Sequence, residues 1–322
     1  DGRGHRSHGQ DNPRGHEVIP LTKTVCITGA TGMIGLSLTK DCISNGIDVI
    51  AIVRNSSVKT NSLPESPRLK ILFSDISELD AIDTKNMKAD VFYHLAWAGT
   101  SKRDRFDNIV QASNIQYTLK AVKLASEMGC KKFIGAGSQA EYGYVQDIID
   151  SRTIPNPVTP YGIAKMASGM MSRNMCDTLG IVHIWPRIFS VYGPMDKDST
   201  MISQVVNKAL MNEEIVIDHG SRPWDYLYES DAGRMLYLMG QTVESSRSYR
   251  VAFGESRPLR EYVSQIIAET GSSSKISFES NDLQYGLNVD AQDLFEDIGY
   301  RPQISFKEGI QRIIASRRMF DE

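Results

Sequence analysis

The sequence has no long apolar run and no dense block of one charge. Its longest strand-like apolar run is residues 49–53, far short of the roughly 18 to 20 residues that span a bilayer. Lys and Arg number 36 against 39 Asp and Glu, which gives a net charge of −3. We therefore expect a soluble protein that neither crosses a membrane nor binds nucleic acid through bulk charge.

Cysteine is also scarce. The four cysteines form no Cys-x-x-Cys pair and have no neighbouring histidine ligands: Cys26, Cys42, Cys130 and Cys176. Disulfide scaffolds and structural zinc sites both need closely patterned cysteines. We expect no disulfide framework, no bound metal and a reducing, cytoplasmic location.

Apolar side chains are nearly missing from residues 1–19, which carry His5, His8 and His16 among several Gly and Arg. Such a segment cannot bury enough surface to offset the entropy of ordering it. A flexible tail is predicted. A metal-binding histidine cluster is the alternative, although the spacing matches no known ligand pattern.

The rest of the chain is typical of a globular α/β protein, with 41% hydrophobic residues in 322. Segments of helical periodicity, such as residues 108–128, alternate with short apolar runs. The runs of strand length are 24–28, 49–53, 69–75, 89–96, 131–138 and 181–188. This alternation predicts βαβ units and a doubly wound parallel sheet.

The regularity loosens after about residue 186. Helical patterns at 201–212, 259–270 and 306–317 alternate with short apolar runs at 215–218, 249–253 and 276–279. We expect a smaller α/β lobe at the carboxyl ends of the sheet, where doubly wound folds bind ligands. The predicted division is a nucleotide-binding domain at 20–185, with 219–248 packing back on it, and a substrate lobe at 186–218 and 249–322.

Three glycines lie where the first predicted strand passes into a helix. Gly29, Gly32 and Gly35 are spaced by three, which lets the backbone turn sharply and approach a pyrophosphate at the helix N-terminus. Tight turns also use glycine. The position of these glycines in a first βαβ unit nevertheless predicts a dinucleotide site.

The end of the second predicted strand bears on which dinucleotide binds. An Asp or Glu there would bind the ribose hydroxyls of NAD, but the strand ends in Arg54, Asn55 and Ser56, with Asp48 at its opposite end. A guanidinium with neighbouring polar donors suits a 2′-phosphate, which favours NADP(H), with NAD as the alternative. A solvated strand-end arginine is the simpler interpretation. Asp75 either binds the adenine amine or merely ends the third strand.

A proton-transfer device is predicted from a tyrosine and a lysine four residues apart. Tyr161 and Lys165 share one face of a helix whose start is indicated by Thr159 as N-cap and Pro160 in the first turn. A cation beside a buried phenol pulls its pKa below about 10. Ser138, at the end of the fifth strand, can hydrogen-bond the same reacting oxygen.

Several motifs share the order and spacing of a known family: TGATGMIG, HLAWAG, NIQYTLKAV, GSQAEYG, YGIAK, PRIFSVYGP and WDYLYESDAG. With them, the chain from about residue 22 to its end resembles the extended short-chain dehydrogenase/reductases that modify nucleotide sugars, and most resembles nucleotide-linked 4-keto-6-deoxyhexose reductases. The resemblance implies a Rossmann domain, a small substrate lobe and a homodimer through the helices that contain Asn114 and Tyr161. It also implies Tyr161 as proton donor and acceptor, Lys165 on the nicotinamide ribose and Ser138 on the substrate oxygen.

The combined expectation for the site has three parts. The catalytic residues are Ser138, Tyr161 and Lys165. The cofactor-binding residues are Gly29, Thr31, Gly32, Met33, Ile34, Gly35, Arg54, Asn55, Ser56, Asp75, Ile76, Leu95, Ala96, Trp97, Asn114, Tyr161, Lys165 and Ile188. The residues that bind a nucleotide-diphosphate sugar are Trp97, Ser138, Gln139, Ser190, Arg222 and Tyr226.

The residues after Ser138 indicate which of the family's reactions this chain can catalyse. Family dehydratases carry an Asp-Glu pair there, because eliminating water needs an acid and a base beyond the tyrosine. This sequence has Gln139 and Ala140, while Glu141 is one position too far and is expected to face away by strand alternation. Dehydration is therefore disfavoured.

Ketone chemistry remains, either as a net reduction or as an epimerisation that retains its cofactor. The missing ribose-binding acid and Arg54 favour NADPH-dependent reduction of the C4 carbonyl of a nucleotide-linked 4-keto-6-deoxyhexose. An NAD-dependent nucleotide-sugar 4-epimerase is the alternative, and a non-catalytic NADP(H)-binding regulator is a minor one.

Three positions depart from the family pattern. Trp224 stands where the family often has a diphosphate-binding arginine, and Arg222 is the candidate replacement. Ser190 replaces a substrate-binding asparagine. Trp97 replaces a small residue, so it either stacks on the sugar or belongs to the core.

Overall fold

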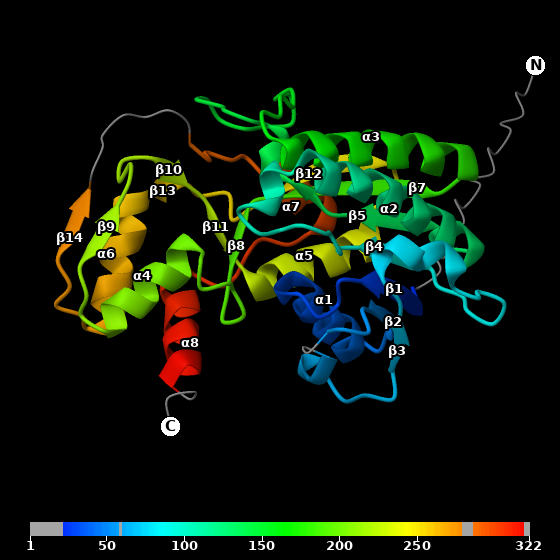
Figure 1. Cartoon of the computed structure of the whole chain (residues 1–322), viewed down its shortest axis with the longest axis horizontal. Coiled ribbons are helices and arrows are strands. Elements are labelled where there is room, and N and C mark those ends of the chain that lie inside the picture. The colour runs from blue at the N-terminus through cyan, green and yellow to red at the C-terminus, as the bar shows by residue number, and fades with distance from the viewer. Residues whose placement is uncertain (1–21, 58–59, 279–285, 319–322) are drawn as a thin grey trace, which may run out of the picture.

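The computed structural model describes residues 22–57, 60–278 and 286–318. Figure 1 shows a large lobe built on a parallel sheet and a smaller lobe beside it. The predicted flexible tail, residues 1–19, lies outside the described residues.

The large lobe contains a doubly wound parallel sheet, as predicted. Within the described residues eight strands form it, with β6 (Gly137–Ser138) pairing off the main path onto β7. The order along the sheet is β12 (Arg247–Val251), β7 (Val182–Ile188), β5 (Lys132–Gly135), β4 (Val91–His94), β1 (Thr24–Thr28), β2 (Asp48–Val53) and β3 (Leu69–Phe73). The order reverses between β1 and β4, which is where such sheets open a crevice for ligands.

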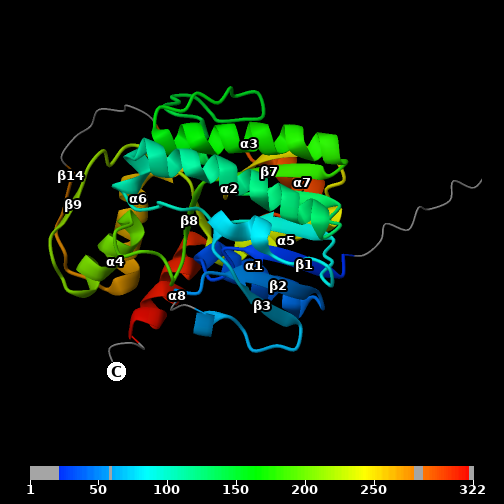
Figure 2. The same ribbon diagram turned by 45° about the vertical axis from the view of Figure 1, so that its right-hand side comes forward.

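Helices cover both faces of this sheet (Figures 1 and 2). One face carries α2 (Asn108–Glu127) and α3 (Pro160–Leu179). The other carries α1 (Met33–Ser44), α5 (Glu229–Thr242) and α7 (Gln292–Ile298). Short 3₁₀ turns connect the rest: η1 (Thr60–Ser62), η2 (Ile76–Ala81), η3 (Asp104–Phe106) and η4 (Gln139–Glu141).

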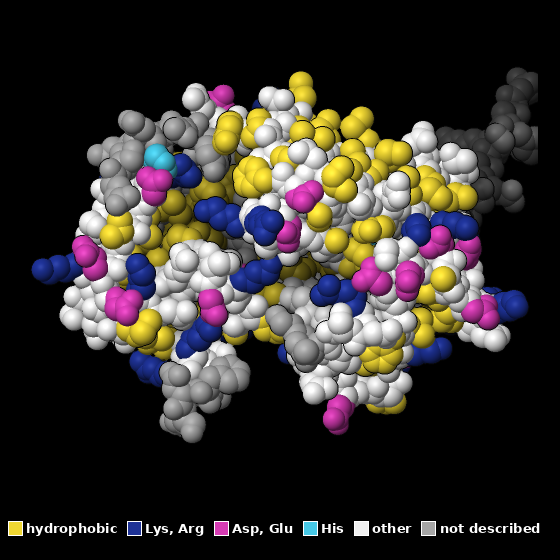
Figure 3. Space-filling model, in the orientation of Figure 1, with side chains coloured by type: hydrophobic (Ala, Val, Ile, Leu, Met, Phe, Trp, Pro, Cys, Tyr) yellow, Lys and Arg dark blue, Asp and Glu magenta, His cyan; other side chains and the backbone are white. Residues whose placement is uncertain are grey.

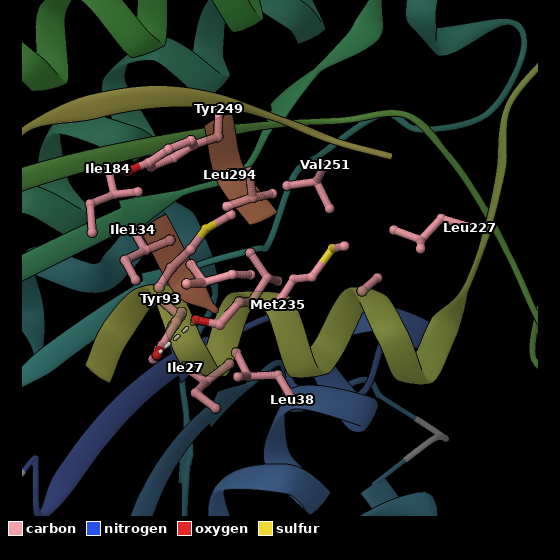
Figure 4. Packing of buried hydrophobic residues seen from close by; sticks show 14 of the residues in the cluster. Ile27, Leu38, Tyr93, Ile134, Ile184, Leu227, Met235, Tyr249, Val251 and Leu294 are labelled. Atoms are coloured by element: carbon pink, nitrogen blue, oxygen red, sulfur yellow. Dashed lines mark hydrogen bonds between the residues drawn. The ribbon is translucent and has the colours of Figure 1, made fainter. Parts of the chain in front are cut away.

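Alternation along the strands divides the core between the two faces, because successive side chains of a strand point in opposite directions. Phe92 and Phe133 pack toward α2 and α3. Tyr93 and Ile134 pack toward α1, α5 and α7 in the cluster of Figure 4, where Tyr93 also donates to the carbonyl of Leu236. Apolar residues therefore fill both faces of each central strand, as a parallel sheet covered by helices requires.

The smaller lobe contains α4 (Met201–Leu210), α6 (Leu259–Thr270) and α8 (Phe306–Arg318), close to their predicted bounds. Its strands pair two by two: β9 (Ile215–Ile217) with β14 (Ile276–Phe278), β10 (Pro223–Trp224) with β13 (Arg257–Pro258), and β8 (Ser190–Tyr192) with β11 (Tyr226–Tyr228). None of the helices in the described ranges is long and apolar enough to cross a membrane.

One part of the predicted smaller lobe belongs to the large lobe instead. Strand β12, expected there as residues 249–253, pairs in parallel with β7 at the sheet edge. Helix α7 follows it, with Leu294 and Phe295 in the core of the large lobe. The reason is that Tyr249 and Val251 on β12 bury against the same face as Ile184, and that pairing completes the edge of β7.

Candidate active site

The glycine loop has the geometry of a phosphate-binding turn. Gly29 has φ of +76°, and Gly32 is the N-cap of α1 without any side-chain cap. A Cβ at Gly35 would lie 2.1 Å from the carbonyl oxygen of Gly29, so Gly35 is needed for close packing within the loop. At Gly32 only the Gly29 carbonyl oxygen, besides the neighbouring residues, would lie within 4 Å of such a Cβ, in a close contact of 3.3 Å, and the rest of its surroundings are open space.

That open space is a cavity of about 740 Å³ between the two lobes. Its walls include Gly29, Gly32 and Met33 on one side and Tyr161 and Ile188 on the other. Ile34, Gly35 and Leu95 line it as well. The room at Gly32 and the uncapped start of α1 fit the pyrophosphate of a dinucleotide.

A second cavity of about 430 Å³ continues from the glycine loop along the ends of β2 and β3. Ten of the predicted cofactor residues line it: Gly29, Thr31, Gly32, Arg54, Ser56, Asp75, Ile76, Leu95, Ala96 and Trp97. Asn55 is exposed beside it and is not among the lining residues. Asp48 lies at the opposite end of β2, in an ion pair with Arg68 at 2.8 Å.

Asp75 is the acidic residue of this second cavity. Its carboxylate accepts from the amide and hydroxyl of Ser77 at 2.9 and 2.8 Å. The hydrogen bond from the Ser77 amide lowers the pKa of Asp75 most. The Ser77 hydroxyl and the charge of Arg54 lower it further. The carboxylate is thus ionised and engaged in starting η2.

The predicted catalytic trio meets in a third cavity, of about 470 Å³, which adjoins the first. Helix α3 starts as expected, because Thr159 accepts from the amide of Gly162 at 3.1 Å and Pro160 occupies the first turn. Ser138, at the end of β6, Tyr161 and Lys165 all line the cavity. The Lys165 ammonium donates to the carbonyl of Ala136 at 2.7 Å.

The predicted lowering of the Tyr161 pKa by Lys165 is wrong. Burial raises the pKa of Tyr161, while Arg105 and hydrogen bonding with Ser138 lower it and Glu141 raises it. Burial also lowers the pKa of Lys165 to about 7, against the opposing charge of Glu141. Desolvation disfavours both charged forms, so Lys165 does not supply the strong cation that the spacing suggested.

Trp97 lies in the cleft rather than in the core. Its ring centroid is 3.6 Å from the Lys165 nitrogen and 6.0 Å from the Tyr161 ring, which it meets edge-on at 83°. The indole donates to Gln111 on α2 at 2.9 Å. Sequence reasoning did not single out Gln111, which has no motif around it.

Asn114 has a different task from the predicted cofactor contact. Its side-chain amide accepts from the Ala98 amide at 2.8 Å and donates to the carbonyls of Ala98 and Val110, both at 3.0 Å. Asn114 is buried and lines none of the three cavities. It holds the loop that follows β4 and thereby positions Trp97.

The predicted substrate residues separate into two groups. Gln139, Ser190 and Tyr226 line the third cavity together with Trp224. The Trp224 indole donates to the Ser190 hydroxyl at 2.8 Å, and that hydroxyl donates to Gln139 at 3.4 Å. Arg222 lines none of the three cavities, so the structure does not place it where the family arginine would act.

Glu141 faces away from the cavity, as expected, although the reason is a 3₁₀ turn rather than strand alternation. Its carboxylate accepts from the Ser138 amide at 2.8 Å, from the Trp185 indole at 3.0 Å and from Arg187 at 2.7 Å. These three bonds hold the turn that carries Ser138. The residue is fully buried.

Trp185 fills the space between the end of the sheet and α3. A Cβ at Gly135, Gly137 or Gly169 would lie 2.4, 2.5 or 2.7 Å from the indole. The first two glycines lie on β5 and β6 just before Ser138, and the third lies on the helix of Tyr161. The three glycines therefore accommodate one large ring.

Two loops supply cations that the sequence analysis missed. Lys102 and Arg105 follow β4, Lys197 follows β8, and all three line the cavity of about 740 Å³. Lys197 donates across the cleft to the Thr100 hydroxyl at 2.9 Å. Figure 3 shows Lys and Arg side chains around a hollow between the lobes. No residue spacing marks such loop cations before the fold is known.

Comparison with known proteins agrees with this geometry. The family model for the NAD dependent epimerase/dehydratase family matches residues 25–252. The chain belongs to this family. It is an NAD(P)-dependent enzyme of the extended short-chain dehydrogenase/reductase type.

Similar members of the family differ in their reactions. A UDP-glucose 4-epimerase of Mycolicibacterium smegmatis is 26% identical, over 89% of this chain and 96% of its own. A dTDP-6-deoxy-L-talose 4-dehydrogenase (NAD(+)) of Aggregatibacter actinomycetemcomitans is 26% identical, over 76% and 90%. The crystal structure of a UDP-glucose 4-epimerase with UDP-glucose from Thermotoga maritima superimposes with a TM-score of 0.82 at 23% identity, over 93% of this chain and 100% of that chain. This last likeness shows the shared fold.

Proposed function

We propose that this enzyme carries out oxidoreduction at C4 of a nucleotide-linked hexose, and specifically the NADPH-dependent reduction of a 4-keto-6-deoxyhexose. The observation that carries the proposal is the convergence of Ser138, Tyr161 and Lys165 in one cleft beside the glycine loop. The talose dehydrogenase acts, by its name, at the same carbon of a 6-deoxy sugar. Net redox chemistry at C4 therefore exists among the relatives.

In this reaction a bound nicotinamide cofactor supplies the reducing equivalents at the sugar carbon. Tyr161 donates its phenolic proton to the oxygen of the forming hydroxyl. Ser138 accepts from the Ala140 amide at 3.2 Å, and its hydroxyl would donate to the same oxygen. Lys165, next to Tyr161 on α3, lies where it can hold the ribose of the cofactor. Stabilising the developing charge is the electrostatic task on which such catalysis depends.

The side chains after Ser138 support ketone chemistry over elimination. Gln139 and Ala140 line the cleft and carry no carboxylate, and the acid that follows them in the chain, Glu141, is buried and bonded to Arg187. A dehydratase needs an additional acid and base at the sugar. Neither residue at these two positions supplies one.

The lining of the second cavity supports NADP(H) as the preferred cofactor. Arg54 lines that cavity at the end of β2, while Asp48 lies at the far end of the strand. A guanidinium with the Ser56 hydroxyl nearby suits a 2′-phosphate. NAD remains the alternative, since the talose dehydrogenase is named as NAD(+)-dependent.

A nucleotide-sugar 4-epimerase is the second candidate, favoured by the epimerase relative from M. smegmatis. The same trio would serve it, with the cofactor retained through both half-reactions. A non-catalytic NADP(H)-binding regulator is the minor candidate. The presence of the complete trio in an open cleft speaks against it.

We also propose a homodimer through α2 and α3, the two helices on one face of the sheet. Apolar side chains are exposed there, with Ile109 at 78%, Ile163 at 53% and Met170 at 64%. Figure 3 shows yellow side chains along this upper surface. Sedimentation velocity of the purified protein tests the proposal, because a monomer at micromolar concentration would contradict it.

The reaction is tested with purified protein, NADPH and a nucleotide-linked 4-keto-6-deoxyhexose. The expected result is substrate-dependent loss of NADPH absorbance, with reduction at C4 confirmed by NMR. Inversion at C4 of a nucleotide hexose without net cofactor change would refute the reductase in favour of the epimerase. Tyr161→Phe should abolish either activity while the protein still folds, as judged by circular dichroism.

A further inference from the structure

The face of the Tyr161 ring is covered by a cation that no motif predicts. The guanidinium carbon of Arg105 lies 4.7 Å from the ring centroid. Trp97 meets the same ring edge-on. Arg105 is exposed and lines both the first and the third cavity, so it stands at the opening beside Tyr161.

Arg105 is held there by an anchored turn rather than by a free loop. It is the central residue of η3 (Asp104–Phe106), and its amide donates to the carbonyl of Ser101 at 3.1 Å. Gln111 donates to the carbonyl of Asp104 at 2.9 Å. Asp107 then caps α2 by accepting from the amide of Ile109. The backbone on both sides of Arg105 is therefore tied to α2.

The charges around Tyr161 make this contact chemically relevant. Burial and the carboxylate of Glu141 raise the pKa of Tyr161, whereas Arg105 and the hydroxyl of Ser138 lower it. Lys165 shares the helix but is itself buried, and its pKa is about 7. Arg105 is the cation that opposes the effect of burial on Tyr161. A cation over a ring face attracts the electron-rich ring and still more its anion.

We propose that Arg105 is a positioning residue for proton transfer, whose guanidinium packs on Tyr161, holds the ring at the cleft and stabilises its phenolate. The inference rests on the proposed function, in which Tyr161 carries the proton. In the oxidative direction the phenolate takes the proton of the sugar hydroxyl. In the reductive direction the phenol returns it to the sugar oxygen.

The first test is independent of turnover. Ultraviolet titration of tyrosinate is recorded for the wild type and for Arg105→Gln, each with and without Tyr161→Phe, so that the difference isolates Tyr161. Arg105→Gln should move this titration upward by about half to one pH unit, because the cation is exposed and partly screened. Arg105→Lys keeps the charge and should restore part of the shift.

The matched control is Arg103→Gln, which removes another exposed arginine from the same loop. Arg103 lines none of the three cavities, so its variant should titrate like the wild type. A Tyr161 titration in Arg105→Gln that equals the wild type, or that Arg103→Gln reproduces, would overturn the proposal.

The second test measures kcat against pH for oxidation of a nucleotide-linked 6-deoxyhexose. The ascending limb of the kcat–pH profile should move to higher pH in Arg105→Gln. The rate near neutral pH should fall about three- to tenfold, because a shift of half to one pH unit lowers the fraction of phenolate by that factor. A change confined to KM would overturn the positioning role. A tyrosinate shift in a protein that oxidises no nucleotide sugar would support the contact and count against the proposed reaction.

Discussion

Replacing Glu141 by glutamine tests whether the buried carboxylate organises the catalytic turn. The side chains of Glu141 and Arg187 are 1% and 17% exposed, and their bond is 2.7 Å long. One carboxylate oxygen accepts from both Ser138 and Trp185, while the other accepts from Arg187. An isosteric glutamine keeps the first two bonds but turns an amide donor toward the guanidinium. The ion pair is lost and the arginine is left without its counter-charge.

The expected cost follows from the partial exposure of the arginine. Removing one partner of a buried ion pair costs about 3 to 5 kcal/mol. The cost should be smaller here, because Arg187 also donates to the Tyr142 hydroxyl at 3.3 Å and its side chain is partly exposed to solvent. We therefore expect Glu141→Gln to lower the free energy of unfolding by about 2 to 3 kcal/mol, or the melting temperature by roughly 5 °C. The value of kcat should also fall, because the lost bond to Arg187 is one of the three that hold the turn carrying Ser138.

The assay is urea unfolding followed by tryptophan fluorescence and by far-ultraviolet circular dichroism, with coincident transitions required before free energies are compared. Glu308→Gln is the control, since Glu308 and Arg312 form an exposed i, i+4 pair that is worth about 0.5 kcal/mol or less. A double-mutant cycle with Arg187→Gln isolates the pair. The reasoning is refuted if Glu141→Gln is no less stable than Glu308→Gln.

Three other substitutions test separate parts of the structure. Arg54→Asp should shift the ratio of kcat/KM from NADPH toward NADH by about 10- to 100-fold, through loss of a charge-assisted contact, and an unchanged ratio would contradict the NADP(H) assignment. Gly35→Ala should lower the melting temperature because its Cβ would meet the Gly29 oxygen at 2.1 Å, whereas Gly32→Ala should fold normally and weaken cofactor binding in calorimetry. Lys165→Met should remove part of the pH dependence of stability, because native Lys165 loses its proton near pH 7 whereas the unfolded lysine does so only near 10.5. The stability of the wild type should therefore rise with pH between these two values. If the melting temperatures of the two proteins changed in parallel with pH, the lowered pKa of Lys165 would be refuted.

The fold could be predicted from the sequence wherever local patterns determine it. Strand-length apolar runs, the capped start of α3 and the glycine turn all depend on residues that are close in the chain. The sequence predicts the wrong lobe for strand β12 because its partner, β7, lies about sixty residues earlier in the chain. No pattern in residues 247–251 indicates that they pair with β7. Short strands have no pattern that distinguishes one sheet edge from another.

The site was predictable only in its outline. Spacing on one helix brings Tyr161 and Lys165 together, but their protonation depends on burial, which the spacing does not reveal. Arg105 and Gln111 act through loop geometry, and Glu141 acts through a turn that replaced the expected strand. Such residues become visible only when contacts between distant segments are known.

Trp185 gives the active site a fixed internal width. The indole lies between the strand end that carries Ser138 and the helix that carries Tyr161, with glycines on both sides of it. The separation between the Ser138 hydroxyl and the Tyr161 phenol therefore depends on a side chain that takes no part in the proposed proton transfer. Related enzymes can then differ in reaction through the loops on the open side of the cleft, which carry Trp97, Arg105 and Lys197. Trp185 meanwhile keeps Ser138 and Tyr161 at a constant separation.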